Sequence, residues 1–304
     1  MRIFVTGASG WIGSAVVVEL LAADHEVVGL ARSDASAEAV AAAGADVRRG
    51  DIGDLDVLRA AAADSDGVVH LAFRHDVAFT GDFETAVNSD LAAIEALGEA
   101  LAGTDRPLAI ASGVAGLKPN TIATERDMGD PFPGAGGRVL NERAALALAE
   151  HGVRSMSVRF APTVHGAGDN GFVAMIVAAD RAAGSAAYIG DGANRWAAVH
   201  RTDAARLVRL GIERAPAGSV LHAVGEEGVA IRDVAEAIGE GIDLPVKSIT
   251  TEQAEGQFGF LARFLALDMP VSSELTRELL SWEPSGPVLV EDLEQGHYFA
   301  GAAG

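Results

Sequence analysis

Three glycines near the start of the chain have the spacing of a phosphate-binding loop. The segment Thr6-Gly7-Ala8-Ser9-Gly10-Trp11-Ile12-Gly13 follows a strand-like run and precedes a helix-like run. The first glycine permits a tight turn, the second lets the backbone approach a pyrophosphate, and the third lets helix and strand pack closely. The free N–H groups at the helix N-terminus would face the phosphates. The pattern predicts a dinucleotide site whose contacts in this loop are Thr6, Gly7, Ser9, Gly10, Trp11, Ile12 and Gly13.

The residues after the second strand-like run indicate which dinucleotide binds. An acidic residue there would bind the adenosine ribose hydroxyls and favour NAD, but the chain reads Leu30-Ala31-Arg32-Ser33. The Arg32 guanidinium matches a 2′-phosphate and Ser33 can donate a further hydrogen bond, so we expect NADP(H) in preference to NAD(H). Arg32 could also be a solvated surface residue. Asp51 and Ile52 follow the third strand and are placed to contact the adenine, although Asp51 could equally cap a helix.

Alternating strands and helices must position these residues. Strands are expected at Ile3–Thr6, Glu26–Leu30, Val47–Arg49, Gly67–Leu71, Leu108–Ala111 and Ser155–Arg159. Helices are expected at Trp11–Ala22, Ser36–Ala43, Leu55–Ala63, Phe83–Ala102 and Asn141–His151. Such alternation predicts an α/β fold of the Rossmann type, a doubly wound parallel sheet with helices on both faces and a small C-terminal α/β cap lobe.

The rest of the chain is less regular. The Pro- and Gly-rich segment 113–137 is expected to be a long loop at the carboxyl edge of the sheet. A helix at Asp203–Arg214, with Thr202 as its N-cap, and a strand at Val220–Val224 extend the first domain. We therefore expect a dinucleotide-binding domain over 1–167, completed by 195–225, and a cap lobe formed by 168–194 and 226–304.

Composition excludes several classes of function. Among 304 residues there are 43 acidic and 23 basic ones, a formal net charge of -20, so nucleic acid and anionic membrane surfaces are unsuitable partners. The absence of cysteine excludes disulfides, thiolate zinc sites and iron–sulfur clusters, and we expect no metal site. The chain opens directly on a strand-like run and contains no apolar run of about 18 residues, so we expect a cytoplasmic protein.

Together these residues resemble the short-chain dehydrogenase/reductase superfamily, in its extended branch of the NAD-dependent epimerase/dehydratase kind. The glycine loop, Asp51-Ile52, Val69-His70-Leu71-Ala72 and Pro162-Thr163-Val164-His165-Gly166 are similar to its motifs, and the resemblance covers nearly the whole chain. It implies further cofactor contacts at Leu71, Ala72, Phe73, Pro162 and Thr163.

The chain departs from this family at its catalytic pair. The family uses a tyrosine as acid or base and a lysine four residues later, but neither Tyr188 nor Tyr298 is followed by lysine at that spacing. The matching helix places either Arg138 and Glu142 or Val139 and Arg143 at these positions, and the distance onward to Arg159 favours the first pair. The chain is therefore placed among the atypical members.

Four residues are candidates for the remaining chemistry. Ser112 follows the fifth strand, where the family has a hydroxyl, and could polarise a carbonyl or bond the turn. His75 is a candidate proton donor or substrate contact, and His165 titrates near neutral pH beside the expected nicotinamide site unless it is structural. Glu142 could accept hydrogen bonds from the nicotinamide ribose hydroxyls.

These observations lead to three hypotheses of function. The first is an NADP(H)-dependent atypical reductase of a small carbonyl or imine, because Phe258, Phe260 and Phe264 could line an apolar pocket rather than pack in a core. The second is a non-catalytic NADP(H)-binding sensor. The third is a sugar-nucleotide epimerase or dehydratase. Enzymes of this kind in the family bind the diphosphate with arginines of the C-terminal lobe; Arg195 lies near one such position, but the sequence offers no convincing second arginine.

The resemblance also implies a homodimer. The helices expected at Phe83–Ala102 and Asn141–His151 would pack against those of a second copy as a four-helix bundle. Leu91, Ile94 and Leu97 could supply the apolar face, or could face the sheet of their own chain.

Overall fold

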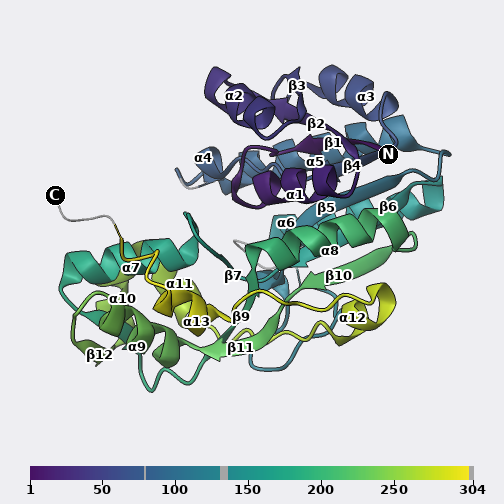
Figure 1. Ribbon diagram of the computed structural model, residues 1–304. Helices are drawn as coiled ribbons and strands as arrows, with labels where there is room; N and C mark the ends of the chain where they lie inside the picture. Colours follow the sequence, from purple (N-terminus) through teal and green to yellow (C-terminus); the bar gives the residue numbers. More distant parts are fainter. Residues whose placement is uncertain (79, 131–135, 301–304) are drawn as a thin grey trace.

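A seven-stranded parallel sheet forms the centre of the computed structural model, which describes residues 1–78, 80–130 and 136–300 (Figure 1). The strand order is β10-β6-β5-β4-β1-β2-β3. The strands are β1 (Arg2–Thr6), β2 (Glu26–Ala31), β3 (Asp46–Arg49), β4 (Gly67–His70), β5 (Pro107–Gly113), β6 (Arg154–Phe160) and β10 (Ser219–Ala223). This arrangement confirms the predicted Rossmann-type α/β fold.

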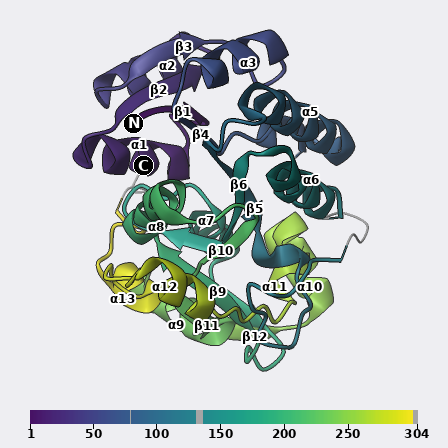
Figure 2. The same ribbon diagram turned by 90° about the vertical axis from the view of Figure 1, so that its right-hand side faces the viewer.

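Helices cover both faces of this sheet. On one face lie α1 (Trp11–Ala22), α2 (Asp34–Ala42) and α8 (Arg201–Arg214). On the other lie α3 (Leu55–Ala63), α5 (Phe83–Leu101) and α6 (Gly136–Ala147), of which α5 and α6 run side by side (Figure 2). The short helices α4 (His75–Ala78), η1 (Val114–Gly116) and η2 (Leu148–His151) lie in the connections.

Two apolar cores arise because successive residues of a strand point to opposite faces. Ile3 and Val5 of β1 belong to the core under α1 and α8, whereas Phe4 between them belongs to the core under α3 and α5. The carboxyl ends of the parallel strands meet at one edge of the sheet. That edge carries the site described below.

The cap lobe has its own apolar core and two small sheets. One sheet has the order β11-β9-β7, and the other pairs β12 with β8. The strands of these sheets are β7 (Thr163–His165), β8 (Ala186–Ile189), β9 (Arg195–His200), β11 (Glu226–Ala230) and β12 (Val246–Ile249). β7 and β9 come from segments predicted above for the first domain, and they share a sheet with β11 of the predicted cap lobe. The helices of the lobe are α7 (Phe172–Ala183), α9 (Ile231–Gly241), α10 (Thr251–Phe258), η3 (Gly259–Leu261), α11 (Ala262–Leu265) and α13 (Leu289–Glu294), and α12 (Glu274–Leu280) packs beside β10.

Three local predictions differ from the structure. Helix α6 begins at Gly136 rather than at Asn141. Asn141 lies inside the helix, and its side-chain amide donates hydrogen bonds to the Val87 carbonyl and to Asp90, which hold α6 against α5. The N-cap of α8 is His200, and Thr202 lies in the first turn, where its hydroxyl is 2.8 Å from His200 Nδ1. The predicted loop 113–137 starts with η1, and its residues 131–135 lie outside the described part.

Two further observations concern the proposed dimer contact and membrane-spanning helices. Ile94 and Leu97, proposed above for a dimer, are buried in the core of their own chain. No helix within the described residues is long and apolar enough to cross a membrane.

Candidate functional site

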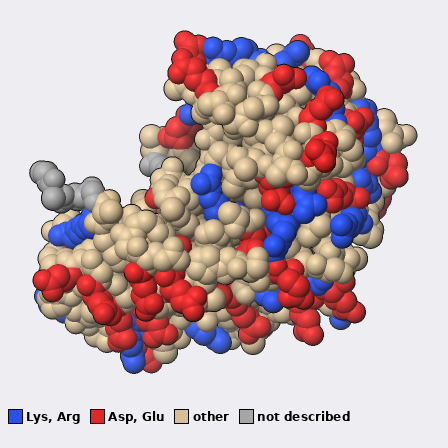
Figure 3. Space-filling view, viewed as in Figure 1, with Lys and Arg blue, Asp and Glu red and all other residues tan. Residues whose placement is uncertain are grey.

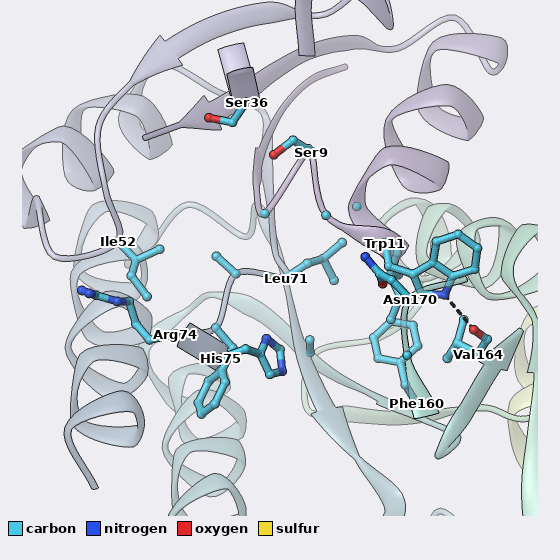
Figure 4. Close-up of a pocket in the computed structure, with 18 of the residues that line it drawn as sticks. Ser9, Trp11, Ser36, Ile52, Leu71, Arg74, His75, Phe160, Val164 and Asn170 are labelled. Atoms are coloured by element: carbon cyan, nitrogen blue, oxygen red, sulfur yellow. Dashed lines mark hydrogen bonds between the residues drawn. The ribbon is translucent and has the colours of Figure 1, made fainter. Parts of the chain in front are cut away.

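A cleft of about 640 Å³ lies where the parallel strands end. Figure 3 shows the surface hollowed between the main sheet and the cap lobe, and Figure 4 shows side chains that line the cleft. The predicted cofactor contacts that line it are Gly7, Ser9, Gly10, Trp11, Ile12, Gly13, Arg32, Asp51, Ile52, Leu71, Ala72, Phe73, Pro162 and Thr163. Thr6 and Ser33 do not.

The glycine loop has no room for side chains. Gly7 has a φ of +69°, and a Cβ there would lie 2.8 Å from the Ala72 nitrogen. A Cβ on Gly13 would lie 1.9 Å from the Gly7 carbonyl oxygen, so this glycine lets α1 pack on the loop. Gly10 borders the cleft and its N–H donates to the Gly7 carbonyl. This tight turn at the start of a helix fits the pyrophosphate of a dinucleotide.

The adenosine end of the cleft is built by the residues that follow β2 and β3. Arg32, Ser36, Asp51 and Ile52 line it. Ser33 is instead the N-cap of α2, where its hydroxyl oxygen accepts a hydrogen bond from the Ser36 N–H. The hydrogen bond expected from Ser33 to a phosphate does not fit this placement, since a residue that caps a helix turns its hydroxyl toward the helix backbone. The Ser36 hydroxyl is used in the same cap and donates to the Ser33 carbonyl at 2.9 Å.

Charged side chains alternate along the rim of this end. Arg32 Nη1 is 3.0 Å from Asp76 Oδ2, and Arg74 Nε is 3.6 Å from Asp76 Oδ1. Arg74 Nη1 in turn lies 3.6 Å from Asp51 Oδ1. The hydrogen bond from Arg32 lowers the pKa of Asp76. Asp76 is therefore an ionised carboxylate at neutral pH.

The floor of the cleft is the segment that leaves β4. Leu71, Ala72 and Phe73 line it. Thr6 lies beneath them, fully buried, where its hydroxyl oxygen accepts the Ala72 N–H at 3.2 Å and lies 2.8 Å from His70 Nδ1. Thr6 therefore positions the floor from below and does not face the cleft.

The far end of the cleft is apolar and lies between the end of β6 and the start of α7. Phe160, Phe172 and Met175 line it, together with Trp11 from the glycine loop. The Trp11 indole N–H donates to the Val164 carbonyl at 2.7 Å, as Figure 4 shows. The Arg201 guanidinium stacks 4.0 Å from the Trp11 ring. These contacts hold Trp11 rigidly at the end where the family resemblance implies the nicotinamide.

One ionisable residue at this far end was missed by the sequence analysis. Asp169 lines the cleft, and its Oδ2 accepts the Tyr298 hydroxyl at 2.8 Å while its Oδ1 accepts the Gly171 N–H. Burial raises the pKa of Asp169. Tyr298 lies 129 residues further along the chain, so no local pattern links the two. The one local feature that could have indicated a role for Asp169 is its place between the Pro162–Gly166 segment and the start of α7.

Of the four predicted catalytic residues, His75 lines the cleft. The residue as a whole is exposed, but its ring centroid lies 5.1 Å from that of Phe73. Partial burial of the ring, with the nearby charge of Arg138, lowers the pKa of His75. His75 is therefore largely neutral at pH 7. Ser112 is 8% exposed and does not line the cleft, although its neighbour Ala111 does.

Glu142 lies behind the cleft and does not line it. Its carboxylate accepts two hydrogen bonds from Arg159, at 2.8 Å each, and one from the Ser157 hydroxyl. Because the buried carboxylate does not reach the cleft, the role at the nicotinamide ribose does not fit this placement. Arg138, which the preferred register aligns with the family's tyrosine, donates to the Ala111 carbonyl and lies 4.4 Å from the Phe73 ring centroid.

His165 also lies away from the cleft. It is fully buried, and its Nδ1 is 2.9 Å from Asp292 Oδ2 of α13. The pair ties β7 to the last helix, which corresponds to the structural alternative. Phe258 is likewise buried in the cap-lobe core, and neither Phe260 nor Phe264 lines the cleft.

A family model and proteins from two yeasts match most of the chain. The model of the family described as NAD dependent epimerase/dehydratase matches residues 3–223. An uncharacterized protein of Schizosaccharomyces pombe is 47% identical over 302 residues, covering 98% of this chain and 100% of that protein. An uncharacterized protein of Saccharomyces cerevisiae is 44% identical over 299 residues, covering 98% and 99%.

Solved structures share the fold at lower identity. The UDP-glucose 4-epimerase of Thermotoga maritima, solved with UDP-glucose, has a TM-score of 0.78 at 20% identity and covers 98% of both chains. DesIV, a dTDP-glucose 4,6-dehydratase from Streptomyces venezuelae solved with NAD, has a TM-score of 0.78 at 21% identity, covering 98% and 96%. Pal from Bacillus thuringiensis has a TM-score of 0.77 at 22% identity.

Proposed function

Because the chain belongs to the NAD dependent epimerase/dehydratase family, we propose that it binds NADP(H) and reduces a small carbonyl or imine. The observation that carries the proposal is the continuity of one cleft from the Arg32 rim, past the glycine loop, to the apolar end at Phe160. The rim supplies a guanidinium for a 2′-phosphate, and the glycine loop supplies the pyrophosphate cradle. A bound cofactor would supply hydride at the far end.

The lining of the far end supports a small substrate. Phe160, Phe172 and Met175 are apolar, and no lysine or arginine of the described chain lines that end to bind a diphosphate. Arg195, considered above for that role, lies outside the cleft and makes two hydrogen bonds to Asp268 instead.

Asp169 is the proton donor of the proposed reaction. Its raised pKa keeps a fraction of the carboxyl protonated at a pH at which an ordinary aspartate has lost its proton. The carboxyl would donate its proton to the carbonyl oxygen as hydride reaches the carbon, and would then recover a proton from solvent. Tyr298 holds the Asp169 side chain in place. His75 is the alternative donor, disfavoured by its lowered pKa.

The test is NADPH consumption, followed by its near-ultraviolet absorbance, across a panel of small aldehydes, ketones and imines. We expect turnover that falls about 10²–10⁴-fold in Asp169→Asn, because a positioned general acid contributes that much. Turnover by the unmodified protein should also fall as the pH rises through the raised pKa of Asp169, since the acid form is the active one.

Asp233→Asn is the matched control, because it removes an exposed carboxylate in the first turn of α9. If Asp169→Asn retains full turnover while His75→Ala loses it, the assignment of the donor is wrong and His75 takes its place. If NADPH binds but no carbonyl or imine is reduced, the non-catalytic sensor is favoured instead.

A sugar-nucleotide epimerase or dehydratase is the second candidate. The family membership and the bound ligands of the two enzymes from Thermotoga maritima and Streptomyces venezuelae favour it. Such an enzyme regenerates its nicotinamide in each cycle, so cofactor that stays bound through purification, with conversion of UDP-glucose, would support it over the reductase.

A homodimer through α5 and α6 remains a proposal. Because Ile94 and Leu97 are used within the chain, the contact would depend on the outer faces of these two helices. Sedimentation equilibrium that gives the mass of a single chain would contradict it.

A further inference from the structure

Two arginines face the adenosine end of the cleft from different strands. Arg32 follows β2 directly, and Arg74 lies four residues after β4. Both line the cleft, and Figure 4 places Arg74 beside Ile52, a predicted adenine contact. The sequence analysis assigned a 2′-phosphate role to Arg32 alone, since Arg74 is not at the position where the second strand ends.

The contacts of the two arginines differ. Arg32 Nη1 donates a hydrogen bond of 3.0 Å to Asp76. Arg74 approaches Asp76 and Asp51 at 3.6 Å each, which is too long for hydrogen bonds. Its Nε is buried and has no hydrogen-bond partner among the described residues. Arg32 and Arg74 thus share the Asp76 carboxylate, whose oxygens lie 3.0 Å from Arg32 Nη1 and 3.6 Å from Arg74 Nε.

Another anion can displace Asp76 from its ion pair with Arg32 at little cost in free energy. The side chains are 56% and 47% exposed, and exposed ion pairs of this kind contribute little to stability. A phosphate monoester carries more negative charge than a carboxylate and offers three acceptor oxygens. It can therefore displace Asp76 from Arg32 and accept hydrogen bonds from both guanidinium groups.

We propose that Arg74 is the second arginine of a 2′-phosphate site and that Asp76 competes with the phosphate for Arg32. The inference rests on the proposed function only in requiring that the cleft binds a nicotinamide dinucleotide. Asp76 then reduces the affinity for NADPH relative to NADH, and Arg74 increases it. Both residues lie on the segment that leaves β4, so this segment, together with β2, selects the cofactor.

Binding titrations of the purified full chain test this directly. NADPH, NADH, adenosine 2′,5′-bisphosphate and adenosine 5′-monophosphate are titrated by calorimetry. The last two probes differ only in the 2′-phosphate. We expect Arg74→Ala to weaken NADPH and the bisphosphate by about ten-fold or more, with NADH and the monophosphate changed less than about two-fold. Asp76→Asn should strengthen NADPH by about three-fold or more and leave NADH unchanged.

Two charge-matched controls accompany these variants. Arg126→Ala removes an exposed positive charge and Glu278→Gln an exposed negative charge, neither of which lines the cleft. Because the chain has a net charge of -20, these controls measure how far overall charge alone changes the affinity for an anion. Arg74→Lys keeps the charge but loses the planar fork, so we expect an intermediate affinity for NADPH.

Each outcome decides the proposal. Equal weakening of NADPH and NADH in Arg74→Ala, or no weakening, would overturn the role of Arg74. Weaker NADPH binding in Asp76→Asn would overturn the competition and show that Asp76 positions Arg32. If the unmodified chain binds neither dinucleotide, the proposed function itself fails. If it binds NADPH and the variants discriminate as expected, the inference holds even when no carbonyl is reduced.

Discussion

Two pairs of arginine and carboxylate, one in the interior and one at the rim of the cleft, illustrate opposite uses of the same chemistry. Arg159 and Glu142 lie behind the cleft, with side chains only 1% and 3% exposed. Arg32 and Asp76 lie at the rim, 56% and 47% exposed. The interior pair cannot separate without leaving a buried charge, whereas the rim pair can separate into water. Only the rim pair is therefore available to a ligand.

The difference corrects a natural reading of the family resemblance. In the preferred of the two registers, Glu142 takes the place of the family's lysine, and that position alone predicts contact with the cofactor. The surrounding Ser157 and Arg159 make it instead the centre of a buried polar cluster that fixes α6 on β6. Asp169 lines the cleft and Asp76 lies at its rim, and neither has a counterpart in the family motifs used above.

Glu142→Gln should produce the largest change in stability. Removing one charge of a buried pair leaves the Arg159 guanidinium uncompensated, so we expect a loss of about 3–5 kcal/mol in the free energy of unfolding. Urea denaturation measures it. The same variant should leave the relative affinity for oxidised and reduced cofactor unchanged, because Glu142 does not line the cleft. A loss of less than about 1 kcal/mol in the free energy of unfolding would show that the buried pair contributes no more to stability than an exposed one.

Asp180 extends the comparison to a buried carboxylate that has no ion pair with an arginine among the described residues. It lies in α7, fully buried, and its Oδ1 accepts a hydrogen bond from the Gln257 amide. Burial raises the pKa of Asp180 to about 7. The folded state thus holds a proton that the unfolded state releases, so stability should fall as the pH rises from about 4 to about 7.

Asp180→Asn should remove this pH dependence. Since each unit of pKa shift corresponds to about 1.4 kcal/mol, the variant should gain up to about 4 kcal/mol relative to the unmodified chain between pH 4 and pH 8. Urea unfolding at both pH values measures the gain, with Asp191→Asn on an exposed loop as control. An equal effect of Asp180→Asn at the two pH values would contradict it.

The smallest effect is expected for Asp76→Asn on stability. An exposed pair contributes about 0–1 kcal/mol, so urea denaturation should barely distinguish the variant from the unmodified chain. Its effect should appear in cofactor binding instead. A loss of more than about 2 kcal/mol would show that Asp76 holds the rim together and is not free to exchange.

Much of the architecture was predictable because its causes are local. The glycines at positions 7, 10 and 13, the alternation of apolar strands with Ala-rich helices, and Arg32 directly after β2 all lie within short stretches of chain. Most of the predicted cofactor contacts line the cleft for the same reason: they follow strands, and the carboxyl ends of parallel strands meet at one edge. Ser33 is an exception, because its side chain serves the helix that it caps.

The sequence by itself determined the fold class, the glycine loop and the arginine that follows β2, since backbone geometry and strand order follow from patterns within a few residues. Only the tertiary structure decided which charged groups are free. Glu142 meets Arg159, Arg74 meets Asp51, and Asp169 meets Tyr298 across distant parts of the chain. Burial and pairing depend on such contacts, and these two properties decide whether a carboxylate stabilises the interior or remains available to a ligand.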